Sequence, residues 1–114
     1  MTSYLDQLRV CANRDVQVLL EKEQDYKGSW KKRGGCGAYM MLARKWDRLE
    51  AIMERSNWDI FTVWENDPRL EGIRDDIRDL RRYLLLVEAE MEARQMAKDQ
   101  SSNVVGNSIT TIPS

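Results

Sequence analysis

The stretch that decides the fold is LEGIRDDIRDLRRYLLLVEAEM, residues 70–91 of the 114-residue chain. Its apolar residues recur at alternating steps of three and four, the spacing of an a/d seam along one face of an α-helix. The pattern predicts a long helix that ends near Lys98. The seam is longer than neighbouring helices of about 20 residues can cover, so Val87 and Met91 are expected to pack against a second protomer. The members of the seam are Leu70, Ile73, Ile77, Leu80, Leu84, Val87 and Met91.

An earlier amphipathic helix is expected between Leu5 and about Tyr26. Thr2 or Ser3 is a suitable N-cap, and Asp6 lies in the first turn, where the helix dipole favours an acidic side chain. Its apolar residues again lie three or four positions apart, at Leu5, Leu8, Ala12, Val16, Leu19 and Leu20.

A middle helix is expected from about Ala38 to Ser56. Residues 57–68 then lead to the long helix, and Asp67 and Pro68 suit its cap and first position. The apolar stripe of the middle helix consists of Leu42, Trp46, Leu49 and Met53. The connector contains Ile60, Phe61, Val63 and Trp64, which fit a short helix or turn over the core.

Composition and charge limit the possible functions. Lys and Arg number 18 against 19 Asp and Glu, so a net charge of -1 gives no strong signal for nucleic acid or an anionic membrane. No apolar run approaches the roughly 18 residues of a membrane span, and the N-terminus lacks signal-peptide features. The absence of histidine excludes imidazole catalysis, which leaves carboxylates, Lys, Arg, Tyr or an oxygen-bound metal for any chemistry. We therefore expect a cytoplasmic protein with no membrane partner.

These features predict an all-α fold, a small helical bundle of three main helices and a short connector helix. One helical domain is expected over residues 1–99. Residues 100–114 are rich in Ser, Asn and Thr, and they are expected to form a flexible tail or an arm that docks on a neighbouring protomer.

The basic segment, residues 27–37 (KGSWKKRGGCG), has the chemistry of an anion site. Its glycines let backbone N–H groups converge, a helix N-terminus is expected directly after it, and Trp30 offers a flat surface for a nucleobase. The GxxxxGK[ST] motif of a P-loop is absent, and a flexible solvated connector is the alternative interpretation. The cations of the segment are Lys27, Lys31, Lys32 and Arg33.

A second polar cluster lies on the long helix. Asp76, Asp79 and Tyr83 share one helical face, where a carboxylate pair can hold Mg²⁺ or pair with basic side chains of a facing helix. Lys45 and Arg48 of the middle helix have the spacing to face this pair. The alternative is a solvated face with local ion pairs, formed by Asp75, Arg78, Asp79 and Arg82.

Three short motifs in this order resemble the phage and bacterial nucleotide-modification-associated domain family. The family pattern is K-x-x-D-Y-G-x-x-W, then R-K-x-x-R-L, then D-x-x-D-L-x-x-Y, and the match extends over about residues 12–87. The chain departs from the pattern at Lys27, which stands between Tyr26 and Gly28. The matching residues are Lys22, Asp25, Tyr26, Gly28 and Trp30, then Arg44, Lys45, Arg48 and Leu49, then Asp76, Asp79, Leu80 and Tyr83.

More distantly, the arrangement is similar to the MazG-like all-α nucleoside triphosphate pyrophosphohydrolases. Those proteins hold Mg²⁺ over a triphosphate with an E-x-x-E pair and an E-x-x-D pair, and their helical pairs bury faces by dimerising. Asp76-x-x-Asp79 resembles the second pair. The first pair is replaced by Lys45-x-x-Arg48, which implies binding without cleavage, or it is shifted to Asp47-x-x-Glu50, which retains a metal site. The resemblance also implies a homo-oligomer.

The expected function is binding of a nucleotide or nucleotide-derived ligand in a bacterial or phage-infected cell. Sequestration of a nucleotide signal is a specific form of this function. One alternative is a Mg²⁺-dependent nucleoside triphosphate pyrophosphohydrolase, and another is a non-catalytic inhibitor that binds a protein. The expected ligand-binding residues are Lys22, Asp25, Tyr26, Trp30, Lys31, Lys32, Arg33, Lys45, Arg48, Asp76, Asp79 and Tyr83. The metal ligands of the hydrolase alternative are Asp47, Glu50, Asp76 and Asp79.

Overall fold

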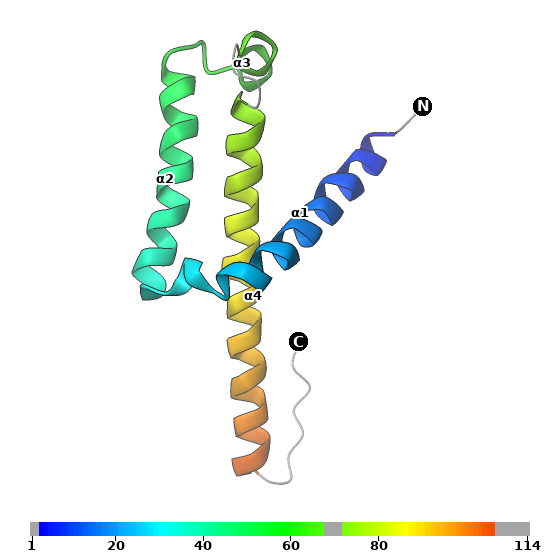
Figure 1. Ribbon diagram of the computed structural model, residues 1–114, viewed down its shortest axis with the longest axis vertical. Coiled ribbons are helices and arrows are strands. Elements are labelled where there is room, and N and C mark those ends of the chain that lie inside the picture. Colours follow the sequence, from blue (N-terminus) through cyan, green and yellow to red (C-terminus); the bar gives the residue numbers. More distant parts are fainter. Residues whose placement is uncertain (1–2, 68–71, 107–114) are drawn as a thin grey trace. The chain divides into compact units, whose positions relative to one another are not determined.

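The computed structural model describes residues 3–67 and 72–106, and every regular element in these two ranges is a helix. The elements are α1 (Tyr4–Tyr26), the short 3₁₀ helix η1 (Ser29–Lys31), α2 (Gly34–Glu54), α3 (Ile60–Asn66) and α4 (Gly72–Gly106) (Figure 1). The all-α prediction is confirmed. The chain divides into two compact units, one up to Tyr83 and one from Leu84.

Local hydrogen bonds define both ends of α1. Ser3 Oγ accepts a hydrogen bond from the Asp6 N–H, and Asp6 Oδ2 accepts one from the Ser3 N–H, at 3.1 and 3.3 Å. This capping box confirms Ser3 as the N-cap, while Thr2 lies outside the described residues. At the other end Lys27 adopts the left-handed conformation (φ 49°), and its N–H donates to the carbonyl oxygen of Glu23.

Helix α2 begins at Gly34, inside the segment that the sequence predicts to be a loop. The prediction that Trp46 lies in the apolar stripe is wrong, because Trp46 is exposed. Lys45 faces α4, where its Nζ meets Asp79. The buried residues of α2 are Ala38 and Leu49.

The hydrophobic core of the first unit lies where α2, α3 and the first turns of α4 meet. Leu49, Val63 and Ile73 are buried there, one from each helix. Figure 1 shows α2 and this part of α4 side by side, with α3 across one end. The residues that pack against this core are Ile52, Met53, Ile77 and Leu80. Within α3, only Val63 is buried, so Ile60, Phe61 and Trp64 do not cover the core as expected.

Asp67 and Gly72 form the start of α4. Asp67 Oδ2 accepts a hydrogen bond of 2.8 Å from the Ile73 N–H in the first turn of α4, while Pro68, the expected first helical position after an Asp67 cap, lies outside the described residues. Gly72 has φ 50°, and a Cβ there would lie 2.3 Å from Asp67 Oδ2, so the turn requires glycine. Pro68 and Leu70 lie outside the described residues.

The second unit contains the rest of α4, which remains helical through Gly106. The helix therefore continues beyond Lys98, near which the sequence predicted its end. Side-chain contacts one turn apart support the preceding turns of α4, from Arg94 to Glu90 at 2.8 Å and from Gln95 to Asp99 at 3.0 Å. Residues 107–114, with the proposed arm residues Ile109, Thr110 and Ile112, lie outside the described residues.

Several apolar side chains of this second unit are exposed: Leu84, Leu85, Met91 and Met96. Within the described ranges, no helix combines the length and apolar character needed to cross a bilayer.

Candidate functional site

The basic segment folds through its own backbone hydrogen bonds. Lys27 and Gly28 are both left-handed, with φ 49° and 77°, and they turn the chain after α1. The N–H groups of Lys31 and Lys32 then donate to the carbonyl oxygens of Gly28 and Ser29, each at 3.1 Å. The segment is therefore a tight turn with an ordered hydrogen-bond pattern, and it leads directly into α2.

The N-terminus of α2 is open to an anion. Arg33 occupies the N-cap position and makes no side-chain capping hydrogen bond. A Cβ added at Gly34 or Gly35 would meet nothing within 4 Å, so the backbone of the first turn can be approached closely. At Gly37 a Cβ would lie 2.7 Å from the Cβ of Arg33, so this glycine lets Arg33 fold over the first turn. The positive end of the helix dipole and the exposed cations of the segment thus coincide.

The Asp76–Asp79 pair faces cations of α2. Lys45 Nζ lies 3.0 Å from Asp79 Oδ2, and Arg48 Nε lies 3.1 Å from Asp76 Oδ1. Asp76 is buried and Asp79 is half-buried. Of the two arrangements left open by the sequence, the structure has the one in which Lys45 and Arg48 stand opposite the carboxylates.

The carboxylates of the alternative metal site are not brought together. Asp47 and Glu50 are exposed. Asp47 is two residues from Lys45, a rotation of about 200° around the helix axis. Across residues 3–67 and 72–106, no group of three or more Asp, Glu, Cys or His side chains is placed to hold a metal ion.

The expected ligand-binding residues fall into two groups. Lys45 lies about 16 Å along α2 from Gly34, and Arg48 about 21 Å, at 1.5 Å per residue. A single phosphate group at the N-terminus of α2 therefore cannot contact either cation. The first group adjoins the basic segment and includes the exposed Lys22, Asp25 and Tyr26 at the end of α1, the half-buried Trp30, and the exposed Lys31, Lys32 and Arg33. The second group lies between α2 and α4 and contains Lys45, Arg48, Asp76, Asp79 and the half-buried Tyr83.

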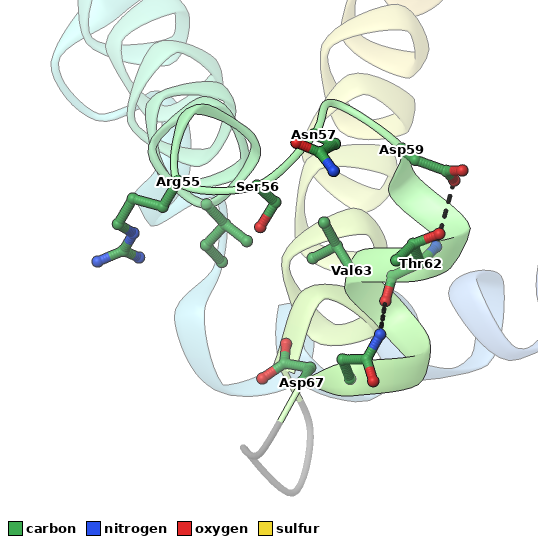
Figure 2. Close-up of a pocket in the computed structure, with 9 residues that line it drawn as sticks. Arg55, Ser56, Asn57, Asp59, Thr62, Val63 and Asp67 are labelled. Carbon is green, nitrogen blue, oxygen red and sulfur yellow. Dashed lines mark hydrogen bonds between the residues drawn. The ribbon is translucent and has the colours of Figure 1, made fainter.

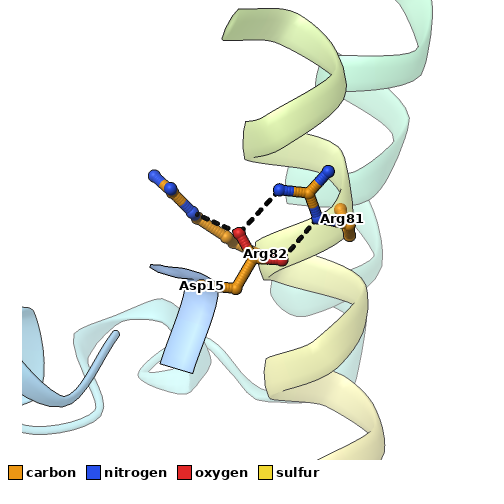
Figure 3. Close-up of polar contacts among 3 residues, drawn as sticks. All are labelled: Asp15, Arg81 and Arg82. Atoms are coloured by element: carbon orange, nitrogen blue, oxygen red, sulfur yellow. Dashed lines mark hydrogen bonds and ion pairs between the residues drawn. The ribbon is translucent and has the colours of Figure 1, made fainter. Parts of the chain in front are cut away.

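A third polar cluster joins α1 to α4 and was not predicted from the sequence. Asp15 is buried, and its carboxylate accepts hydrogen bonds from both Arg81 and Arg82 (Figure 3). Arg81 Nη2 and Arg82 Nε each lie 2.8 Å from Asp15 Oδ1, and Arg81 Nε donates to Oδ2. The hydrogen bond from Arg81 is the main reason why the pKa of Asp15 is lower than its usual value, and it raises the pKa of Arg81.

This cluster corrects the interpretation of Arg82 as part of a solvated face. One feature of the sequence points to this cluster, namely the position of Asp15 on the apolar face of α1 between Leu8 and Leu19. An acidic residue at such a position requires a buried cationic partner, and two adjacent arginines on the seam helix could supply it.

A cavity of about 510 Å³ lies between the end of α2 and α3 (Figure 2). Asp59 in its wall is occupied as the N-cap of α3, accepting from the N–H groups of Phe61 and Thr62 at 3.0 and 3.2 Å. These hydrogen bonds lower the pKa of Asp59, and the hydrogen bond from Thr62 has the largest effect. Asn66 Nδ2 donates to the carbonyl oxygen of Thr62 at 2.9 Å. Polar side chains in the cavity wall, those of Asp59 and Asn66, are therefore hydrogen-bonded to backbone groups of α3.

Comparisons of the chain with protein-family models, curated proteins and solved structures found no match.

Proposed function

We propose that this protein binds the phosphate groups of a nucleotide or nucleotide-derived ligand at the basic segment, residues 27–37, without cleaving them. The observation that most supports this function is the first turn of α2. Its N-cap residue, Arg33, makes no side-chain cap, and the backbone at Gly34 and Gly35 is open. Exposed cations directly precede the turn, so charge and backbone N–H groups converge where a phosphate would bind.

In this proposal the two groups of polar residues have different roles. Trp30 or Tyr26 stacks on the base, and Lys22 lies at the same end of α1 as an additional cation. Lys45 and Arg48 mainly hold α2 against α4, because they form ion pairs with Asp79 and Asp76.

The resemblance to the nucleotide-modification-associated domain family supports a nucleotide as the ligand, and a bacterial or phage-infected cytoplasm as the location. The pairing of Lys45 and Arg48 with the two aspartates supports binding without hydrolysis. A metal-dependent hydrolase needs carboxylates at that position, and here two cations occupy it.

The proposal is tested by isothermal titration of the full chain against a panel of nucleotides, each with and without Mg²⁺. We expect saturable binding of at least one nucleotide that does not require Mg²⁺, with the ligand recovered intact. Release of phosphate or pyrophosphate that depends on Mg²⁺ would support the hydrolase instead. No binding to any member of the panel would leave the protein-binding inhibitor as the better hypothesis.

A further inference from the structure

Helix α3 exposes most of its large apolar side chains. Within the helix only Val63 is buried. Phe61 and Trp64 are three positions apart, which makes them neighbours on the helix surface, and they are 74% and 47% exposed. Aromatic side chains of this kind are enriched at the centres of protein interfaces. The exposed residues, here called the α3 aromatic surface, are Trp58, Ile60, Phe61 and Trp64.

The fold does not account for a tryptophan at position 58. The backbone of Trp58 is left-handed (φ 59°), a conformation that glycine or asparagine adopts with less strain than a residue with a large side chain. Its side chain is 61% exposed, so it adds little to the core. Residues held in such sparsely populated conformations cluster at functional sites. The ring of Trp58 is therefore better explained by a surface contact than by folding.

The charges of this part of the chain favour a cationic partner. Residues 56–67 contain Asp59, Glu65 and Asp67 and no Lys or Arg. Arg55, directly before them, points away from α3 (Figure 2). A nucleic acid or an anionic membrane would meet like charge here, whereas Lys or Arg side chains would be attracted.

One guanidinium group already lies on the α3 aromatic surface. Cζ of Arg74, near the start of α4, lies 5.4 Å from the centroid of the Trp64 ring, within the range of a cation–π contact. In residues 3–67 and 72–106, neither Phe61 nor Trp58 has such a contact. The Arg74 contact shows which chemistry the surface accepts, and the two other rings are open to the same chemistry.

We propose that the α3 aromatic surface binds an arginine-containing segment of another protein. The guanidinium groups of that segment stack on the exposed rings, and its positive charge is met by Asp59 and Glu65. The surface and the basic segment adjoin opposite ends of α2, whose 21 residues extend about 30 Å at 1.5 Å per residue. This contact is therefore separate from the proposed nucleotide site.

NMR titration of the full chain with an arginine peptide tests the surface. The probe is a capped dodecapeptide in which Arg and Ala alternate, and its control carries citrulline, which is neutral and similar in shape, in place of Arg. We expect saturable shifts of the indole N–H signals of Trp58 and Trp64, and at least tenfold weaker binding of the citrulline peptide. Equal binding of the two peptides, no binding up to millimolar concentration, or shifts confined to Trp30 and Trp46 would overturn the proposal.

Two aromatic variants separate this contact from a structural role. Phe61→Ala should bind the arginine peptide at least fivefold more weakly, while Tyr39→Ala, which removes a 65% exposed ring from α2, should bind like the parent. Trp58→Gly should bind at least threefold more weakly, and its melting temperature should be equal or higher, because glycine suits the left-handed backbone. Parent-like binding by F61A or W58G would overturn the proposal.

Arg74→Ala is expected to have the opposite effect. It uncovers the Trp64 ring and removes a cation that competes with the peptide, so affinity for the arginine peptide should rise at least twofold. The matched control is Arg14→Ala, which removes the same charge from an exposed position on α1 and should bind like the parent. Weaker binding by R74A than by R14A would overturn the proposal.

Two other occupants of the surface are distinguished by the same signals. Phosphatidylcholine vesicles that bind the parent but not F61A would make a lipid surface the occupant. Shifts of the Trp58 and Trp64 signals that depend on protein concentration without peptide would make it a second copy of the chain. Either result would overturn the proposal. No experiment here contains a nucleotide, so the outcome does not depend on the proposed function.

Discussion

Lys45 Nζ lies 3.0 Å from Asp79 Oδ2, and this ion pair joins α2 to α4. The side chains are 20% and 29% exposed, so both retain some contact with water. The pair therefore stabilises the packing of the two helices moderately, in the range expected for a charged hydrogen bond that is only partly desolvated.

A double-mutant cycle measures this pair. We expect Asp79→Ala to lower the free energy of unfolding by about 1–2 kcal/mol, with most of the loss absent when Lys45→Met is already present. Urea denaturation of the four proteins gives the coupling energy. Asp47→Ala, an exposed carboxylate on α2, is the control and should change stability by less than about 0.5 kcal/mol. A coupling energy near zero would mean that the pair contributes nothing to folding.

Asp15 is expected to contribute more than Asp79, because it is buried and accepts hydrogen bonds from two arginines. Replacing Asp15 with Asn removes the charge but keeps the size, and we expect a loss of about 3 kcal/mol, since two arginines lose their anion. Asp25→Asn, an exposed position on the same helix, serves as the control. If thermal or urea unfolding shows the two variants to be equally stable, the cluster has no structural role.

The same carboxylate should make stability depend on pH in the acid range. The pKa of Asp15 is lower in the folded protein than the ordinary value of an aspartate, chiefly because of the hydrogen bond from Arg81. Its contribution is therefore complete above about pH 4 and is lost as the pH falls through the folded-state pKa. We expect the stability of the parent to decline more steeply below pH 4 than that of Asp15→Asn. Asp59, whose pKa is also lowered, titrates in both proteins and cancels in this comparison. Parallel stability curves would contradict the assignment.

Lys27 is expected to be a site where glycine stabilises the fold. It ends α1 in the left-handed conformation, which costs a residue with a Cβ roughly 1–2 kcal/mol and glycine very little. Lys27→Gly should raise the free energy of unfolding by up to about 1 kcal/mol, once the greater freedom of glycine in the unfolded chain is included. Lys32→Gly is the matched control, because Lys32 is right-handed (φ -57°) and glycine there should not stabilise. A less stable Lys27→Gly protein would show that the Lys27 side chain makes a stabilising contact.

The residues that sequence reasoning placed correctly are those whose structure depends on local patterns. Ser3 is the N-cap, one of the two expected candidates, and Ile73, Ile77 and Leu80 lie in or against the core, because caps and helical periodicity are properties of neighbouring residues.

The errors concern side chains whose environment is set by a distant helix. Trp46 is exposed although Leu49 and Met53 of the same stripe pack in the core with residues of α3 and α4. Asp15 is buried against Arg81 and Arg82, and these partners lie 66 and 67 residues further along the sequence, so no local pattern indicates the pairing. The separation of Lys45 from the basic segment also required the structure, since it depends on α2 beginning as early as Gly34.

The most direct test of the proposed function is the salt dependence of affinity for the tightest nucleotide of the panel, compared between two triple variants. Lys31, Lys32 and Arg33 are replaced together by Ala in the test variant. The control removes the same charge from the exposed Arg14, Arg55 and Lys98.

Exposed charges are screened over about 8–10 Å at physiological ionic strength, so binding by the parent and the control should weaken as salt rises. The test variant should bind at least tenfold more weakly at low salt, retain its melting temperature, and respond less to salt. If the test variant binds as tightly as the parent at low and high salt, the ligand does not bind at the basic segment and the account is contradicted.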